Sequence, residues 1–151
     1  PIETLIAKIS YRHTEETDWL NWISDNLLAT YDRKQRRTTA SVQWFEGTKH
    51  ELRVKAQMLA FTARNPKPYL GDLSGNLNPY QTSLPPITVS QLAFQVRYRY
   101  EIQPLAYLYV VYTKGGRVAM YDEEDSLNEL YKRPWNDPQS DNFTIKLRYR
   151  F

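Results

Sequence analysis

Cationic side chains recur at every second position in three stretches of this chain, and their spacing indicates what chemistry it can do. Successive side chains of a β-strand point to opposite faces, so charges two residues apart share one face. The cations in question are Arg53, Lys55, Arg97, Arg99, Lys146, Arg148 and Arg150. The main acidic residues in the same alternating positions are Glu51 and Glu101. A surface built this way is far more positive than the chain as a whole.

Two interpretations of this cationic surface stay open. A concave surface of one sign focuses the electric field and draws in anions or acidic saccharides. Alternatively, the charges fill an interior by pairing with acids on other strands, or are covered by a plug. A nucleic-acid partner is not expected, because alternation sends Arg and Tyr to opposite faces, whereas a base-stacking surface needs both together.

No catalytic constellation is predicted, and the chain is not expected to be an enzyme. His13 and His50 are its two histidines, and they are expected at opposite ends of their strands. None of the zinc-protease, nucleophile-elbow or phosphate-loop motifs occurs. The acidic run from Asp122 to Asp125 could gather a divalent cation, but a solvated acidic loop is the plainer interpretation. Neither a cofactor nor a metal is predicted.

Six β-strands are predicted to position these side chains. Their expected ranges are 2–13, 27–45, 49–63, 88–102, 105–115 and 141–151. Short turns are expected at Gly47 and Pro104, and long loops at 14–26, 64–87 and 115–140. The segment from Ser126 to Lys132 has apolar residues at helical spacing, and could be one helical turn or part of the last loop. In the last strand the apolar side is Phe143, Ile145, Leu147, Tyr149 and Phe151.

Strand length and loop pattern favour an antiparallel transmembrane β-barrel. Most predicted strands exceed about ten residues, the length that crosses a bilayer, whereas soluble strands average about 5–6. Long and short connections alternate, as expected for long extracellular loops and short periplasmic turns. The mean hydropathy of −0.67 is compatible with this, because barrel strands show lipid only half of their residues. The absence of cysteine excludes a disulfide scaffold.

Several runs resemble a known family. They are DNLLATYDRKQ (25–35), TASVQWFEGTKHELRVKAQ (39–57), QLAFQVRYRYEIQPLAYLYVVYTKGG (91–116) and FTIKLRYRF (143–151). They resemble the C-terminal region of a group of Gram-negative proteins. These proteins pair an N-terminal carbohydrate-binding-module-like domain with a C-terminal domain of unknown function, regarded as an outer-membrane barrel. The resemblance implies that fold and location, and it implies no catalytic residues.

The sequence therefore predicts the C-terminal portion, about six strands, of one larger outer-membrane barrel. Six strands are too few for a single-chain barrel, which starts at about eight, so upstream strands or other chains are expected partners. The nine charged residues named above are expected to face the lumen. The five apolar residues of the last strand are expected to touch lipid and to signal to the barrel-assembly machinery. The expected role is a pore, transport or surface saccharide handling. The alternative is a soluble antiparallel β-sandwich that acts as a binding module.

Overall fold

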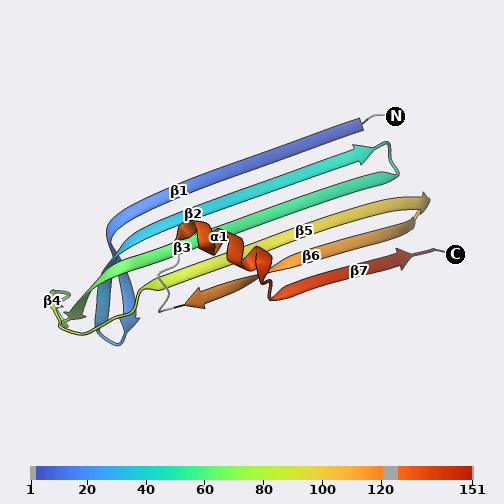
Figure 1. Ribbon diagram of the computed structural model, residues 1–151. Coiled ribbons are helices and arrows are strands. Elements are labelled where there is room, and N and C mark those ends of the chain that lie inside the picture. The colour runs from blue at the N-terminus through green and yellow to red at the C-terminus, as the bar shows by residue number, and fades with distance from the viewer. Residues whose placement is uncertain (1–2, 121–125, 151) are drawn as a thin grey trace.

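A computed structural model describes residues 3–120 and 126–150 of the chain as one antiparallel sheet (Figure 1). The spatial order of its strands is β1-β2-β3-β5-β6-β7, and the short β4 pairs with β3. The strands are β1 (Glu3–Ser24), β2 (Leu27–Glu46), β3 (His50–Gly71), β4 (Leu77–Pro79), β5 (Ile87–Gln103), β6 (Ala106–Met120) and β7 (Ser140–Arg148). Within these residues one helix, α1 (Leu127–Asn136), precedes β7. The prediction of an all-β antiparallel fold is thus confirmed.

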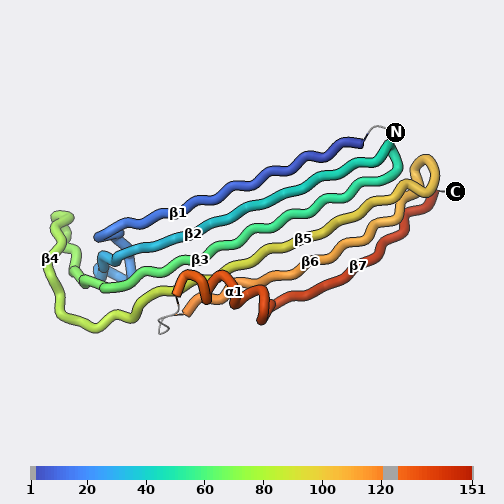
Figure 2. The backbone as a smooth tube through the Cα atoms, turned by 45° about the horizontal axis from the view of Figure 1, so that its top comes forward, coloured from blue at the N-terminus to red at the C-terminus, as the bar shows by residue number. Residues whose placement is uncertain are grey.

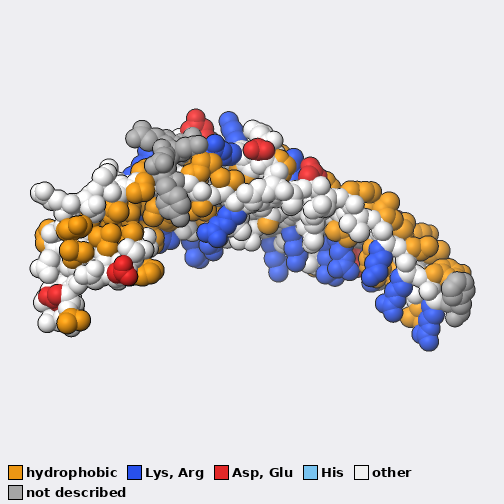
Figure 3. All heavy atoms as spheres, turned by 90° about the horizontal axis from the view of Figure 1, so that it is seen from below, with side chains coloured by type: hydrophobic (Ala, Val, Ile, Leu, Met, Phe, Trp, Pro, Cys, Tyr) orange, Lys and Arg blue, Asp and Glu red, His pale blue; other side chains and the backbone are white. Residues whose placement is uncertain are grey.

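The sheet is a single curved layer (Figure 2) with β1 and β7 as its two edges. The side view in Figure 3 shows an arch that has Lys and Arg along its hollow side. Residues directly opposite each other in an antiparallel pair share a face. The register therefore assigns each paired side chain to the concave or the convex face. Arg53 lies opposite Gln43 and Arg97, on the concave face. Val54 lies opposite Val42 and Val96, on the convex face.

The long strands extend well beyond their expected ends. We predicted a loop at 14–26, but β1 continues to Ser24 and the connection to β2 is only residues 25–26. This prediction was wrong because the polar residues of the segment pair across the strands. Glu16 accepts a hydrogen bond from Arg33 at 3.0 Å. A β-bulge between Glu16 and Trp19 bends the hairpin, and Asp18 takes a φ of 55° there.

Other predicted boundaries also shift. β3 runs to Gly71 and β6 to Met120, so both expected loops after them are shorter. The segment that contains Leu130 is a full helix with a capping box, in which Ser126 and Glu129 each bond the other's backbone N–H. β7 ends at Arg148 rather than at residue 151. The beginning of the first predicted strand at Ile2, the acidic run 122–125 and Phe151 lie outside the described residues.

The bent end of the β1–β2 hairpin builds a small core against the concave face. Its buried residues are Ala29, Tyr31 and Ala63, and the partly buried ones are Trp19, Ile23, Phe61, Leu84 and Ile87. The rings of Trp19 and Phe61 meet edge-to-face with centroids 5.7 Å apart. Burial raises the pKa of the Tyr31 phenol. This end of the sheet, opposite the turns at 47–49 and 104–105, is called the loop end below, and the other is called the turn end.

Within the described ranges, no helix is long and apolar enough to span a bilayer.

Candidate functional site: the cationic concave face

The concave face holds most of the charged residues that the sequence predicted to act together. Arg53 lies opposite Arg97, and Glu51 lies opposite Arg99. Lys146 and Arg148 of β7 lie opposite Tyr109 and Tyr107 of β6 on this face. In Figure 3 the Lys and Arg side chains follow the hollow side of the arch over most of its width. Arg150 is described but lies beyond the end of β7.

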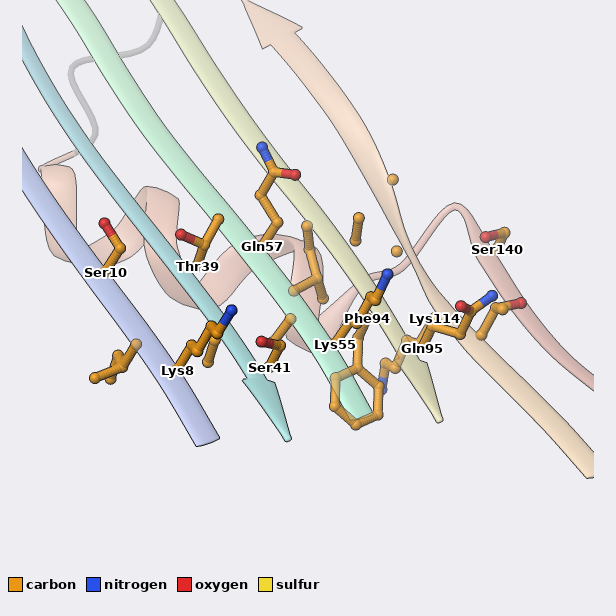
Figure 4. Close-up of a pocket in the computed structure, with 18 residues that line it drawn as sticks. Lys8, Ser10, Thr39, Ser41, Lys55, Gln57, Phe94, Gln95, Lys114 and Ser140 are labelled. Carbon is orange, nitrogen blue, oxygen red and sulfur yellow. The ribbon is translucent and has the colours of Figure 1, made fainter. Parts of the chain in front are cut away.

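A groove of about 750 Å³ crosses the middle of this face. Figure 4 shows Ser10, Thr39 and Gln57 rising from neighbouring strands on the side of the sheet that faces away from α1. Lys114, also at the groove, lies on the α1 side, with its ammonium over the ring of Trp135. One register row places Lys8, Ser41 and Lys55 side by side, with Gln95 and Thr113 after them. The next row places Ser10, Thr39 and Gln57 together, with Gly115 beyond. Hydroxyl, amide and ammonium groups thus converge on one hollow.

Charge on the concave face is strongly unbalanced. Along the paired strands it carries eleven cations, namely Lys8, Arg12, Arg33, Arg37, Arg53, Lys55, Arg97, Arg99, Arg117, Lys146 and Arg148. It carries three carboxylates, those of Glu16, Glu51 and Glu101. The whole chain has 20 Lys and Arg against 17 Asp and Glu. The excess therefore comes from segregation by face, and the face attracts anions.

One buried carboxylate locks the turn end of this face. Glu51 is only 5% exposed, and its oxygens lie beside the guanidinium groups of Arg53 and, at 3.1 Å, Arg99. Arg99 also lies over the ring of Tyr107, and Arg97 over the ring of Tyr109. Both contacts are within the range of a cation–π interaction. These partners hold the guanidinium groups in fixed directions across the face.

Several cations near the groove lack such a carboxylate partner in the part of the chain that the structure describes. Arg12 lies directly opposite Arg37. Arg97 lies directly opposite Arg53, which already has Glu51 as its partner. Like charges directly opposite each other in a sheet are destabilising. Lys8, Arg12, Arg37 and Lys55 are all exposed. An anion bound between such side chains relieves this repulsion, and binding or guiding anions is what the arrangement can do chemically.

Sequence reasoning missed five cations of this face: Lys8, Arg12, Arg33, Arg37 and Arg117. Their alternation with apolar neighbours was a usable signal in the first strand. Arg37 lies in the predicted strand 27–45 but was not assigned to the lumen face, and Arg117 was assigned to the predicted loop 115–140, although both pair in the sheet. The histidines do not join the groove. His13 bonds Glu15 at 3.0 Å, and His50 bonds Tyr98 at 2.6 Å on the convex face.

The apolar residues of the last strand lie on the opposite, convex face. Phe143, Ile145 and Leu147 are 65%, 61% and 61% exposed, and pair with Tyr112, Val110 and Leu108 of β6. Tyr149 follows the end of β7 and is 48% exposed. Phe151 is not among the described residues. Among the described residues no group of three His, Cys, Asp or Glu could hold a metal ion.

Comparison of the chain with models of protein families, with curated proteins and with solved structures finds no match.

Proposed function

We propose that this sheet is part of the wall of a transmembrane β-barrel in a bacterial outer membrane. Its convex face contacts lipid, and its concave face lines a lumen through which anions or acidic saccharides pass or are held. The observation that carries the proposal is the pairing of an uncovered apolar face with a cationic hollow face in one sheet.

The convex face of the turn end has no protein over it in the described residues. Ile9 at one edge is 80% exposed, and Ile145 near the other is 61% exposed. Between them Val54, Val96 and Val110 are covered only by neighbours in the same layer. A contiguous apolar surface of this kind marks contact with a membrane or a partner. β1, β2, β3, β5 and β6 are longer than the roughly 9–11 residues needed to cross a bilayer, and β7 has 9 residues.

Closure of the barrel requires more strands than the described sheet contains. β1 and β7 present unpaired edges, and a membrane-embedded edge leaves backbone groups unsatisfied at a cost of several kcal/mol each. We infer that upstream strands of the same barrel pair with β1 and that the barrel's first strand pairs with β7. The family resemblance of 39–57 and 91–116 supports this arrangement, in which the chain supplies the last strands. Strands from other chains are the second way to close it.

The alternating apolar side of the last strand is also proposed to act as the assembly signal. An edge strand with free backbone groups and an apolar face is a ready partner for β-augmentation by the barrel-assembly machinery. Phe151→Asp is expected to reduce insertion into the membrane, and Leu147→Asp to do the same. Lys146→Asp, on the other face of the same strand, is the matched control. Equal membrane yields for the three variants would count against this role.

Two neighbouring residues of β5 test which face meets lipid. Val96 is convex and Gln95 is concave, at the same height in the sheet. Val96→Arg should cost about 2–4 kcal/mol if it faces lipid near the bilayer middle. Gln95→Arg should change little. The measurement is the folded, heat-modifiable fraction of the full-length protein in lipid vesicles, and similar losses for both variants would overturn the proposal.

The alternative, a soluble β-sandwich, needs a second layer over the convex face. Only α1 covers any of that face among the described residues. A sandwich formed with another protein should stay monodisperse without detergent, whereas the barrel should precipitate. Analytical ultracentrifugation with and without detergent separates the two.

A further inference from the structure

The convex face changes character beneath α1. Towards the turn end it consists of apolar rows such as Val42, Val54, Val96 and Tyr112. Under α1 it presents Thr38, Ser90 and Arg36 instead. α1 lies across β3, β5 and β6 at this level (Figure 1). The helix therefore begins to cover the face where the apolar rows stop.

α1 satisfies the polar groups that it covers. The Ser90 hydroxyl donates a hydrogen bond to the carbonyl oxygen of Leu130. The hydroxyls of Thr38 and Tyr131 are 2.8 Å apart. Arg36 donates to the side-chain oxygen of Asn128 at 2.7 Å. These bonds fix the helix on the outside of the sheet, and they give partners to polar groups that lipid could not satisfy.

The helix has one side buried against the sheet and one exposed side. Leu130 is 1% exposed and Pro134 is also buried, both towards the sheet. Lys132 is exposed on the other side, and Trp135, which is 42% exposed, lies at the edge of the buried side. The indole of Trp135 packs edge-to-face on Phe94, the last ring of the apolar rows, with centroids 5.3 Å apart. The Lys114 ammonium lies 5.4 Å from the same indole.

A second aromatic group marks the opposite end of the apolar rows. The imidazole of His50 stacks on Tyr100 at 4.8 Å, and Tyr98 bonds the same imidazole. Trp44 lies on this face as well, opposite Leu5 and Leu52. From Tyr100 to Ser90 the strand covers about 34 Å at ~3.4 Å per residue. A tilt of about 40° reduces this to roughly 25 Å, the height of the apolar band of outer-membrane barrels.

We propose that α1 lies in the outer headgroup layer of the membrane and completes its aromatic girdle. Trp135 sits at the boundary of the acyl chains, and Lys114 and Lys132 contact the phosphate groups of anionic lipid headgroups. A helix on the outer wall thus supplies the girdle residue that other barrels place on a strand. The inference rests on the proposed barrel and adds the level at which the bilayer ends.

The four tryptophans of the chain provide the test. Full-length proteins that each keep one of Trp19, Trp22, Trp44 and Trp135, with the other three changed to Phe, are folded into phosphatidylcholine vesicles. The lipids carry bromine at either a shallow or a deep acyl position. Trp135 and Trp44 should both lose about half of their fluorescence or more to shallow bromine and less to deep bromine, because both sit in the interface. Trp19 in the concave core and Trp22 at the hairpin end should lose little to either.

The outcomes separate the two proposals. Quenching of Trp44 without quenching of Trp135 leaves the barrel in place and overturns the interfacial position of α1. Quenching of neither overturns the barrel, and the interfacial helix with it. Deep quenching of Trp135 that exceeds its shallow quenching also overturns the headgroup position.

A spin label gives a second measurement if a tryptophan variant does not fold. The chain has no cysteine, so Lys132→Cys and Ser74→Cys each accept one label. The label at position 132 should be accessible both to oxygen and to a water-soluble nickel reagent, as in a headgroup layer. The label at position 74, in the loop before β4, should be accessible mainly to nickel. Identical profiles at the two positions would overturn the inference.

Discussion

The two ends of this sheet use their faces in opposite ways. At the turn end the convex face is apolar and uncovered, while the concave face is cationic. At the loop end the concave face carries the apolar core of Tyr31, Phe61 and Ala63. There the convex face carries polar residues, such as Ser90 and Thr62, that are buried beside α1. The polarity of the sheet reverses along the same strands.

The difference shows which face each end of the sheet must shield from water. A strand end that stands in water has to bury one face against its own chain, and the β1–β2 hairpin bends over to provide that cover. A sheet between lipid and a water-filled lumen needs no such cover, since each face already meets a suitable medium. In the proposed barrel, this reversal would put the boundary between membrane and water near the row of Leu92 with Gly116 and the next row, Ser90 with Val118.

The largest effect is expected from a side chain added at that boundary. A Cβ at Gly115 would overlap the carbonyl oxygen of Leu92 and lie 3.1 Å from its carbon. Because that obstacle is backbone, Gly115→Ala should lower the free energy of unfolding by about 3 kcal/mol. Urea unfolding of the refolded protein measures it. Gly71→Ala should be nearly neutral, because its added carbon would meet the Leu28 side chain at 3.4 Å and the Asn26 carbonyl oxygen at 3.7 Å, both ordinary contacts. An equal loss there would contradict the explanation.

A slightly smaller loss is expected from the core of the loop end. Trp19 packs on Phe61 and lies under the guanidinium of Arg33. Because the ring is only partly buried, Trp19→Ala should cost about 2 kcal/mol. The matched control is Trp22→Ala, since that ring is 65% exposed and should matter by less than about 0.5 kcal/mol. If both changes cost the same in thermal unfolding, the loop end has no core of its own.

On the concave face of the turn end, charge reversal should change ion selectivity and leave the stability of the protein nearly unchanged. Lys8→Glu combined with Lys55→Glu reverses two charges in the groove. The chloride-to-potassium permeability ratio, taken from reversal potentials in planar bilayers, should fall about threefold or more. Lys34→Glu, on the convex face of the loop end, should leave it unchanged. If the permeability ratio of the double variant equals that of the unchanged protein, anions do not pass along this face.

The smallest effect concerns the capping box of α1. The backbone N–H of Ser126 donates to Glu129 and lowers the pKa of that carboxyl group. The stabilisation is therefore present above the ordinary glutamate pKa of about 4.3 and is lost as pH falls through the lowered folded value. Amide exchange within α1 should speed up over that acid range. Glu129→Gln should abolish the pH dependence, and its persistence would point to another group.

Much of the turn end could be predicted from sequence because alternation is a local signal. The spacing in 50–60, 91–101 and 143–148 assigned Arg53 and Arg97 to one face and Val54 and Ile145 to the other before any pairing was known. The register places those residues as predicted. The same reasoning failed at the loop end, where strands were predicted as loops. Its strands are rich in charged and polar residues that suggest loops, and these residues are satisfied by partners far away in the chain.

The sequence alone determined that this chain forms long antiparallel strands with one apolar and one cationic side. Alternation with a period of two is visible in neighbouring residues and needs no knowledge of strand pairing. Tertiary structure alone decided where the strands end, since Glu16 with Arg33 and Lys67 with Asp18 are contacts between strands. It alone decided which side is hollow, and that α1 seats on the convex face. Curvature and docking depend on pairing and on the groups that a neighbour satisfies, and no local pattern records these.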